Sequence, residues 1–470
     1  MSISNTHYGA ERIALMLEGL KSIYFIGIGG INMSSLAHVT HNRGYTVGGS
    51  DRTRTELTER LENEGIVVNY THSAEQVKDY DAFVYTVAIS EDNPEYRFAV
   101  DNGRPCISRA DYLGYIMMAY PVRIGISGMH GKSTCTSMCA ETLICAGAEP
   151  TVLSGAQLPI MGGAYCVGDG DSFVFEACEY MDSFLDFNPT VAVILNIEMD
   201  HVDYFKSMEQ IRSSFGRFAD IAGEQGYAVY NADDEDVVTA LESFKGNRVS
   251  FGIENDTAML RAVNITSQYG RYSFDVLRDG EMLCHIDLRV SGYHNIYNAL
   301  AATGACLLAG LSAEMIASGL HEFCGAGRRM EFKGCINGGE VYDDYGHHPT
   351  EISATLRGAR AMTEGRLVCV YQPHTYSRTA ALLDEFSKAF EYCDKVIFTD
   401  IYAAREKNEW GVSSEGLARK IGKRAAYAHS FKEAADMVAA ELEQGDVAVV
   451  MGAGDIYKTF DHMVFDSIDM

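Results

Sequence analysis

Short apolar runs recur along the chain, each followed by a glycine or polar turn and then by a segment with helical spacing. The runs at 22–28 (SIYFIGI), 46–50 (TVGGS) and 81–89 (DAFVYTVAI) predict strands, with a helix near 33–42 between the first two. The order of strand, glycine turn, helix and strand is that of a βαβ unit. The pattern predicts a parallel sheet in the first part of the chain.

Two later blocks repeat this arrangement. In the second block, an apolar run at 122–127 leads through a glycine turn into a helix at 134–146, and SFVFEA and TVAVILNI add strands. The third block begins near residue 341 and contains LVCVYQP, KVIFTDIY and DVAVVMGAG. Alternating strands and helices predict an α/β fold with mostly parallel sheets. The length of 470 residues predicts two to three domains, with hinges near 119–123 and 325–327.

Charge and composition exclude several classes of protein. The net charge of −27 argues against nucleic acid or an anionic membrane as partner, so local basic groups and metal must hold any anionic substrate. No apolar run approaches the roughly 20 residues that span a bilayer, and no signal peptide is visible. Twelve cysteines without a C-x-x-C pair indicate reduced thiols. We expect a cytoplasmic protein.

The stretch ISGMHGKST at 126–134 has the order of a phosphate-binding loop but not its usual spacing. The pattern G-x-x-x-x-G-K-[ST] requires glycine where Ile126 stands. Gly128 and Gly131 still frame a turn between a predicted strand and helix, and Lys132 and Ser133 follow. An ordinary turn with a surface lysine is the alternative. The strand and helix on either side favour a phosphate loop.

The loop GIGGINM is an incomplete dinucleotide fingerprint. Gly27 and Gly29 fit G-x-G-x-x-G, but Asn32 occupies the third position, and Asp51 lies near the place of an acid that accepts from a ribose hydroxyl. The loop alone supports a nicotinamide dinucleotide, a nucleotide sugar and a structural turn equally.

Polar residues follow predicted strands in the second block. Glu176 follows SFVF, and His201 follows VAVILNIEMD, so both would converge with Ser133 beside a nucleotide. A hydroxyl, a carboxylate and an imidazole suit Mg²⁺ that bridges phosphate oxygens. Taken singly, Glu176 could be a surface acid and His201 a loop histidine.

Three further segments carry candidate ligand-binding residues. Asn295 and Asn298 lie one helical turn apart and indicate ligand contacts, or helix capping in the case of Asn295. GRRMEF and VYDDYGHHPTE bring arginine, aspartate and two histidines into the third block, and YQPHTYSRT adds His374 and Arg378. The pair His347 and His348 has no third ligand at zinc spacing, so we expect no metal there.

These segments together resemble the Mur ligases over nearly the whole chain. The resemblance rests on GIGGINM, SGMHGKST, FEACEYMDSFL, NIEMDHVDYF, HNIYNALAA, GAGRRMEF, DDYGHHPTE and QPHTYSRT. DDYGHHPTE is typical of members that use UDP-N-acetylmuramate and of muropeptide ligases. The resemblance implies a Rossmann-like UDP-sugar domain at 1–119, a central ATPase domain at 120–325 and a Rossmann-like domain at 326–470 that completes the ATP and amino-acid sites.

The resemblance also implies roles for individual residues. For ATP it implies Gly128, Met129, His130, Gly131, Lys132, Ser133, Thr134, Asn295, Asn298, Arg329 and Asp344, and for the UDP-sugar Gly27, Gly29, Gly30, Asn32 and Asp51. The implied catalytic set is Lys132, Glu176, His201, Arg329 and Asp344. Ser133, Glu176 and His201 would bind Mg²⁺, or Mn²⁺, and His347, His348 and Arg378 fall in the amino-acid region.

The implied reaction transfers the γ-phosphoryl group of ATP to the lactyl carboxylate of UDP-N-acetylmuramate, and L-alanine then attacks the acyl phosphate. This reaction belongs to peptidoglycan precursor synthesis by a cytoplasmic monomer or homodimer. A ligase that joins a tripeptide, a nicotinamide-dependent oxidoreductase and a nucleotide-binding module without catalysis are the alternatives.

Five positions depart from the commonest form of the family. Asn32 stands where glycine is frequent, and Ser133 replaces threonine, but both keep the needed chemistry. Cys178 and Met181 replace acids. Thr375 replaces an arginine found in some members, which puts in doubt a second arginine for the amino-acid carboxylate.

Overall fold

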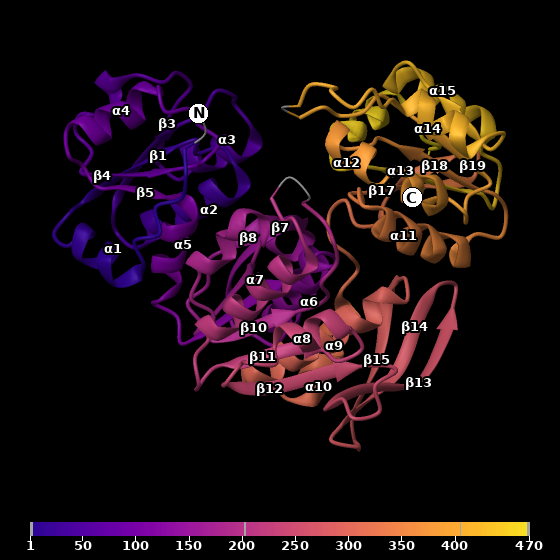
Figure 1. Cartoon of the computed structure of the whole chain (residues 1–470), viewed down its shortest axis with the longest axis horizontal. Helices are drawn as coiled ribbons and strands as arrows, with labels where there is room; N and C mark the ends of the chain where they lie inside the picture. The colour runs from indigo at the N-terminus through magenta and orange to yellow at the C-terminus, as the bar shows by residue number, and fades with distance from the viewer. Residues whose placement is uncertain (1–2, 202–203, 405, 468–470) are drawn as a thin grey trace.

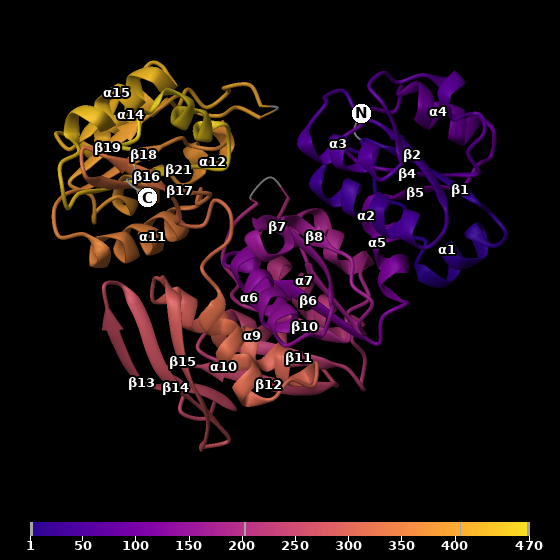
Figure 2. The same cartoon turned by 180° about the vertical axis from the view of Figure 1, so that it is seen from behind.

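The chain folds into three α/β units, each built on one sheet (Figures 1 and 2). The structure is a computed structural model that describes residues 3–201, 204–404 and 406–467. The first and last units stand on either side of the middle one in both views. Within the described residues, no helix has the length and apolar character needed to cross a membrane.

The first unit contains a five-stranded parallel sheet in the order β3-β2-β1-β4-β5. Its central strands are buried on both faces, and this explains why they are continuous apolar runs in the sequence. The strands are β1 Ser22–Ile26, β2 Thr46–Ser50, β3 Val67–Asn69, β4 Ala82–Tyr85 and β5 Cys106–Ser108. The helices are α1 Ala10–Leu17, α2 Ile31–Asn42, α3 Glu56–Asn63, η1 Ala74–Val77, α4 Pro94–Asp101 and α5 Arg109–Met117.

The middle unit contains a ten-stranded sheet in the order β15-β14-β13-β12-β11-β10-β6-β9-β7-β8. The strands are β6 Val122–Ser127, β7 Thr151–Leu158, β8 Gly163–Cys166, β9 Ser172–Glu176, β10 Val191–Ile194, β11 Tyr227–Asn231, β12 Asn247–Gly252, β13 Leu260–Gln268, β14 Arg271–Arg278 and β15 Glu281–Ser291. The helices are α6 Lys132–Cys145, η2 Pro159–Met161, η3 Tyr180–Asp186, α7 Met208–Ile221, α8 Glu235–Ala240, α9 His294–Leu308 and α10 Ala313–Glu322.

An antiparallel ribbon, β13-β14-β15, extends the middle sheet and was not predicted. Two-residue loops join its strands, and all four loop residues have positive φ: Tyr269, Gly270, Asp279 and Gly280. This backbone matches the twist of a hairpin, for which an Asp-Gly pair is a strong sequence signal. The ribbon alternates buried and exposed residues and lacks a continuous apolar run.

The third unit contains a six-stranded sheet in the order β16-β17-β21-β18-β19-β20, parallel except at β16. The strands are β16 Glu331–Ile336, β17 Gly339–Asp344, β18 Leu367–Tyr371, β19 Lys395–Phe398, β20 Ala425–Tyr427 and β21 Val447–Met451. The helices are α11 Pro349–Met362, α12 Tyr376–Ala381, α13 Leu383–Ala389, α14 Ser414–Ile421, α15 Phe431–Glu441 and η4 Ile456–His462. We retain 119/120 and 325/326 as proposed domain boundaries, because they fall between α5 and β6 and between α10 and β16.

The units differ in how they are joined. One cluster of buried apolar side chains runs from Ile23 and Phe25 of β1 to Phe173 and Phe175 of β9, so the first two units share a core. The third unit has two clusters of its own on the faces of its sheet. Apolar packing therefore holds the first unit to the middle one, and polar contacts dominate at the third.

We predict that Gly114→Ala destabilises the junction of the first two units. A Cβ at Gly114 in α5 would stand 2.0 Å from the backbone oxygen of Asp186, which cannot rotate away. The expected loss is about 1–3 kcal/mol of unfolding free energy, read from denaturant unfolding. Gly416→Ala in the exposed part of α14 is the control and should not destabilise. Equal stability of the parent protein and the Gly114→Ala variant would contradict the packing described here.

Candidate functional site

The predicted phosphate loop connects β6 to α6 as a glycine-framed turn. Gly128 and Gly131 have φ values of 142° and 83°, which favour glycine. A Cβ at Gly131 would also stand 2.6 Å from Oδ1 of Asn298, so the loop passes α9 too closely for a side chain. The unpaired N–H groups and positive dipole at the start of α6 suit an anion.

Asn196 fixes the loop from the neighbouring strand. It follows β10, and its Oδ1 accepts from the N–H of His130 at 2.8 Å while its Nδ2 donates to the carbonyl of His130 at 3.0 Å. The carbonyl of Asn196 accepts from the N–H of Met129 at 3.2 Å. Three hydrogen bonds thus hold the middle of the loop to the sheet.

Lys132 is turned toward protein groups. Its Nζ donates to the carbonyls of Gly128 at 2.5 Å and Met129 at 3.2 Å, and it lies 3.0 Å from Oε2 of the buried Glu179. Burial alone would lower the pKa of Lys132, but Glu179 raises it to about 12. The side chain is therefore a fixed cation. Phosphate oxygens of a bound nucleotide would replace Glu179 as its partner.

Glu179 also holds His201, because Oε1 of Glu179 lies 3.0 Å from Nε2 of His201. Glu176 lies at the end of β9, where its Oε1 accepts from the N–H of Gly155 at 2.5 Å. The structure describes no hydrogen bond that joins the predicted Mg²⁺ ligands Ser133, Glu176 and His201 to one another. Glu179 instead links His201 to Lys132.

A cavity of about 1150 Å³ opens beside the loop between the middle and third units. Its volume suits a nucleotide-sized ligand. The predicted ATP residues that line it are His130, Gly131, Thr134, Asn295, Asn298, Arg329 and Asp344. Those that do not line it are Gly128, Met129, Lys132 and Ser133, and all lining residues belong to 130–362.

Asn295 and Asn298 are buried in the first turns of α9. Nδ2 of Asn295 donates to the carbonyl of Ser291 at 2.7 Å, and Nδ2 of Asn298 donates to Oδ1 of Asn295 at 2.9 Å. The first of these bonds joins the helix to the preceding strand. Both residues also line the cavity.

Arg329 joins the third unit to the start of α6, and Asp344 is held within the third unit. Nη2 of Arg329 donates to Oγ of Ser133 at 3.3 Å. Asp344 is buried and accepts from the N–H groups of Met330 at 3.0 Å and Gly346 at 2.8 Å. Burial raises the pKa of Asp344 to about 6, although Arg329 opposes the shift.

The predicted amino-acid residues His347, His348 and Arg378 all belong to the third unit, and the ring of His348 lies 5.0 Å from that of His130. Arg378 contacts Asp200 of the middle unit, with Nη2 3.1 Å from Oδ1, and both side chains are nearly buried. Burial lowers the pKa values of His347 and His374 to about 4, so both rings are neutral near pH 7. Thr375 has a φ of 65° and caps α12, where its Oγ1 accepts from the N–H of Arg378.

His130 joins carboxylates of two units. Its Nε2 lies 2.9 Å from Oε2 of Glu198, and its Nδ1 lies 3.2 Å from Oε1 of Glu351 in α11. Burial would lower the pKa of His130, but the two carboxylates raise it to about 9. Thr350 adds a hydrogen bond across the same junction, from its Oγ1 to Oε1 of Glu198 at 2.7 Å.

The glycine loop of the first unit is separate from this cavity. Gly27 has a φ of 85°, and the N–H of Gly29 donates to Oδ2 of Asp51 at 2.9 Å. Asp51, which directly follows β2, therefore stabilises the glycine loop through this hydrogen bond. Gly30 precedes α2, and Asn32 is exposed in its first turn.

Sequence reasoning missed the acids that organise the site: Glu179, Glu198, Asp200 and Glu351. The first lies inside FEACEYMDSFL, and the next two lie inside NIEMDHVDYF, so the motifs were noticed but these side chains were not. Some of these acids pair with residues that are distant in the sequence; Asp200, for example, pairs with Arg378. No local spacing indicates such a pair.

Family models match all three units. The model described as the Mur ligase family catalytic domain matches residues 22–121, the Mur ligase middle domain matches 126–306, and the Mur ligase glutamate ligase domain matches 328–454. The chain belongs to the Mur ligase family. ATP use is typical of this family, and one structural neighbour, the MurF ligase of Thermotoga maritima, was solved in complex with ADP (14% identity, TM-score 0.62, covering 88% of this chain and 93% of that one).

Several relatives match nearly the whole chain. The UDP-N-acetylmuramate–L-alanine ligase of Acetivibrio thermocellus is 46% identical over 93% of this chain and 94% of its own. That of Clostridium perfringens is 42% identical over 93% and 96%. The crystal structure of the Thermotoga maritima UDP-N-acetylmuramate–alanine ligase has a TM-score of 0.78 and 28% identity, covering 94% and 98%.

We predict that Asp344→Asn changes how stability depends on pH. The folded-state pKa of about 6 exceeds the ordinary value of 3.8, so ionising Asp344 costs folding free energy as pH rises. Asparagine cannot ionise, so the unfolding free energy of the variant minus that of the parent should rise by about 1.4 kcal/mol between pH 5 and pH 8. Urea unfolding at both pH values measures this difference. A difference that does not change with pH would refute the buried, weakly acidic carboxyl.

Proposed function

We propose that this chain joins L-alanine to the lactyl carboxylate of UDP-N-acetylmuramate, with ATP as the phosphoryl donor. The observation that carries the proposal is 46% identity to a ligase of that name over nearly the whole length of both chains. The phosphate loop beside a cavity between two units supports it independently. Such a cavity provides a place where ATP and an acceptor carboxylate can meet.

The phosphate loop would hold ATP through backbone groups and Lys132. The triphosphate would lie over the start of α6, where N–H groups of the loop and the ammonium of Lys132 face anionic oxygens. Lys132 would exchange Glu179 for phosphate and reduce the repulsion between ATP and the lactyl carboxylate. Asn295 and Asn298 lie where adenine contacts are expected, and Arg329 and Asp344 would close the cavity from the third unit.

Ser133, Glu176 and His201 fit Mg²⁺, or Mn²⁺, by their chemistry. They offer a hydroxyl, a carboxylate and an imidazole at the phosphate end of the site, and Glu176 is only partly buried. A bound divalent ion would neutralise phosphate charge in the phosphoryl-transfer step. Glu179 keeps His201 oriented, as a carboxylate commonly does for a metal-ligating histidine.

Arg378 is the proposed site of the amino-acid carboxylate. It is a nearly buried cation, and the histidines beside it are neutral near pH 7, so they add no competing charge. Thr375 supplies a helix cap where some relatives have arginine, which leaves Arg378 as the cation of this segment for an incoming carboxylate. Asp200 would release Arg378 as the substrate binds. Closing the third unit would keep water from the acyl phosphate.

Phosphate release tests the reaction. We expect rapid phosphate release only when ATP, UDP-N-acetylmuramate and L-alanine are all present, with the amide product seen by mass spectrometry. The peptide L-alanyl-γ-D-glutamyl-diaminopimelate in place of alanine tests a muropeptide ligase, and a nicotinamide cofactor tests an oxidoreductase. Faster turnover with the peptide, or none with alanine, would refute the proposal.

A matched pair of Glu→Gln variants separates the roles of two acids in one segment. We predict that Glu176→Gln slows turnover about a hundredfold and that high Mg²⁺ partly restores it, because the variant loses a metal ligand. We predict that Glu179→Gln also slows turnover but gains nothing from Mg²⁺, because it leaves Lys132 and His201 without their carboxylate. Rates measured against Mg²⁺ concentration decide between them.

Unfolding measurements control this comparison. Glu179 is 1% exposed, so Glu179→Gln should also lower stability, whereas Glu176→Gln should not. Identical Mg²⁺ profiles for both variants would overturn the distinction between a metal ligand and a positioning residue.

A further inference from the structure

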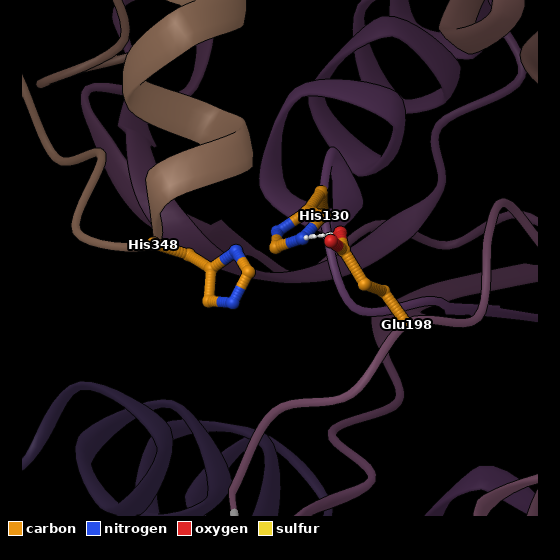
Figure 3. Close-up of side chains that lie close together, drawn as sticks. All are labelled: His130, Glu198 and His348. Atoms are coloured by element: carbon orange, nitrogen blue, oxygen red, sulfur yellow. Dashed lines mark hydrogen bonds and ion pairs between the residues drawn. The ribbon is translucent and has the colours of Figure 1, made fainter. Parts of the chain in front are cut away.

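A compact group of two histidines and one glutamate lies where the middle and third units meet. His130 comes from the phosphate loop, Glu198 from the segment after β10, and His348 from the start of α11. One ligand atom from each of the three lies within 4.8 Å of the others, and Figure 3 shows the three side chains converging. The group is distinct from Ser133, Glu176 and His201.

The spacing of residues along the chain does not indicate this group. We expected no metal at His347 and His348, because no third ligand stands at ligand spacing nearby in the chain. The fold supplies partners for His348 from two distant segments instead, and His347 takes no part. Metal ligands need only meet in space, so spacing along the chain does not detect a group of this kind.

Two imidazoles and one carboxylate form the ligand set of many open zinc sites. Mg²⁺ prefers oxygen ligands, so this set favours Zn²⁺, Co²⁺ or Ni²⁺ over the ion that accompanies ATP. Tetrahedral zinc ligands stand about 3.4 Å apart, so modest side-chain rotations would bring these atoms into place. Nε2 of His130 already lies 2.9 Å from Oε2 of Glu198.

The surroundings of the group also resemble those of a metal site. Nδ1 of His130 lies 3.2 Å from Oε1 of Glu351, at ion-pair distance but without the alignment of a hydrogen bond, and a metal-ligating histidine commonly directs its second nitrogen to a carboxylate. His348 is 3% exposed, and its Nε2 is buried without a hydrogen-bond partner among the described residues. A buried nitrogen without a partner is costly unless a ligand or an ion satisfies it.

We infer that His130, Glu198 and His348 form a site for a transition-metal ion of the Zn²⁺ class, which ties the phosphate loop to the third unit. The site does not depend on the proposed reaction. Because its ligands come from two units, a bound ion would fix one unit against the other. Since His130 also lines the cavity, such an ion would restrict the opening that exchanges nucleotide.

Metal titration of the full chain tests this site without nucleotide or substrate. Chelator-treated protein is titrated with Co²⁺, followed by its visible absorption, and Zn²⁺ affinity is measured by competition with an indicator. We expect one tight equivalent in the parent protein. His348→Gln and Glu198→Gln should each weaken it at least tenfold, and Glu351→Gln should weaken it by a smaller factor.

Two controls separate this site from other ligands in the chain. His201→Gln, in the Mg²⁺ set, and His347→Gln, next to the group, should both retain the parent affinity. Thermal unfolding of each metal-free variant checks that it is folded. No tight equivalent in the parent, or binding lost in His201→Gln and kept in His348→Gln, would overturn the inference. An intense near-ultraviolet thiolate band with Co²⁺ would overturn it as well, because it would assign the ion to cysteine.

Discussion

Charge, and not apolar packing, connects the third unit to the phosphate loop. Side-chain contacts that cross this junction include those from Arg329 to Ser133, from Glu351 to His130, from Thr350 to Glu198 and from Arg378 to Asp200. Their partners in the middle unit are His130 and Ser133, at the phosphate loop and the start of α6, and Glu198 and Asp200, in the segment after β10. The geometry of the site therefore depends on whether these polar contacts are made.

This dependence explains how a strongly acidic chain can bind anionic substrates. Two cations of the site are already paired with protein carboxylates, Lys132 with Glu179 and Arg378 with Asp200. If Lys132 and Arg378 bind the substrates as proposed, an entering phosphate or carboxylate group would replace a protein acid instead of adding charge to an uncompensated cation. Of these two pairs, Arg378 with Asp200 joins the middle and third units, so substrate binding at Arg378 would also change a contact between the units.

The sequence predicted the fold where residues carry local information. Buried parallel strands are continuous apolar runs, so 46–50 and 122–127 were located with the bounds of β2 and β6, but α6 starts two residues earlier than expected, at Lys132. The antiparallel ribbon escaped because its strands have one exposed face. In the site, loop glycines and strand-end residues were visible, whereas Glu179, Asp200 and Glu351 act through partners that only the folded chain brings near.

The shared core of the first two units has a consequence for cooperativity. Apolar side chains pack continuously from β1 to β9, whereas the third unit keeps its own clusters. Loss of either of the first two sheets would expose the apolar surface of the other, so they are expected to unfold together. The third unit shares no buried apolar cluster with them among the described residues, so its separation is expected to expose less apolar surface. The chain is therefore expected to unfold as two cooperative units and not three, with the division between the middle and third units.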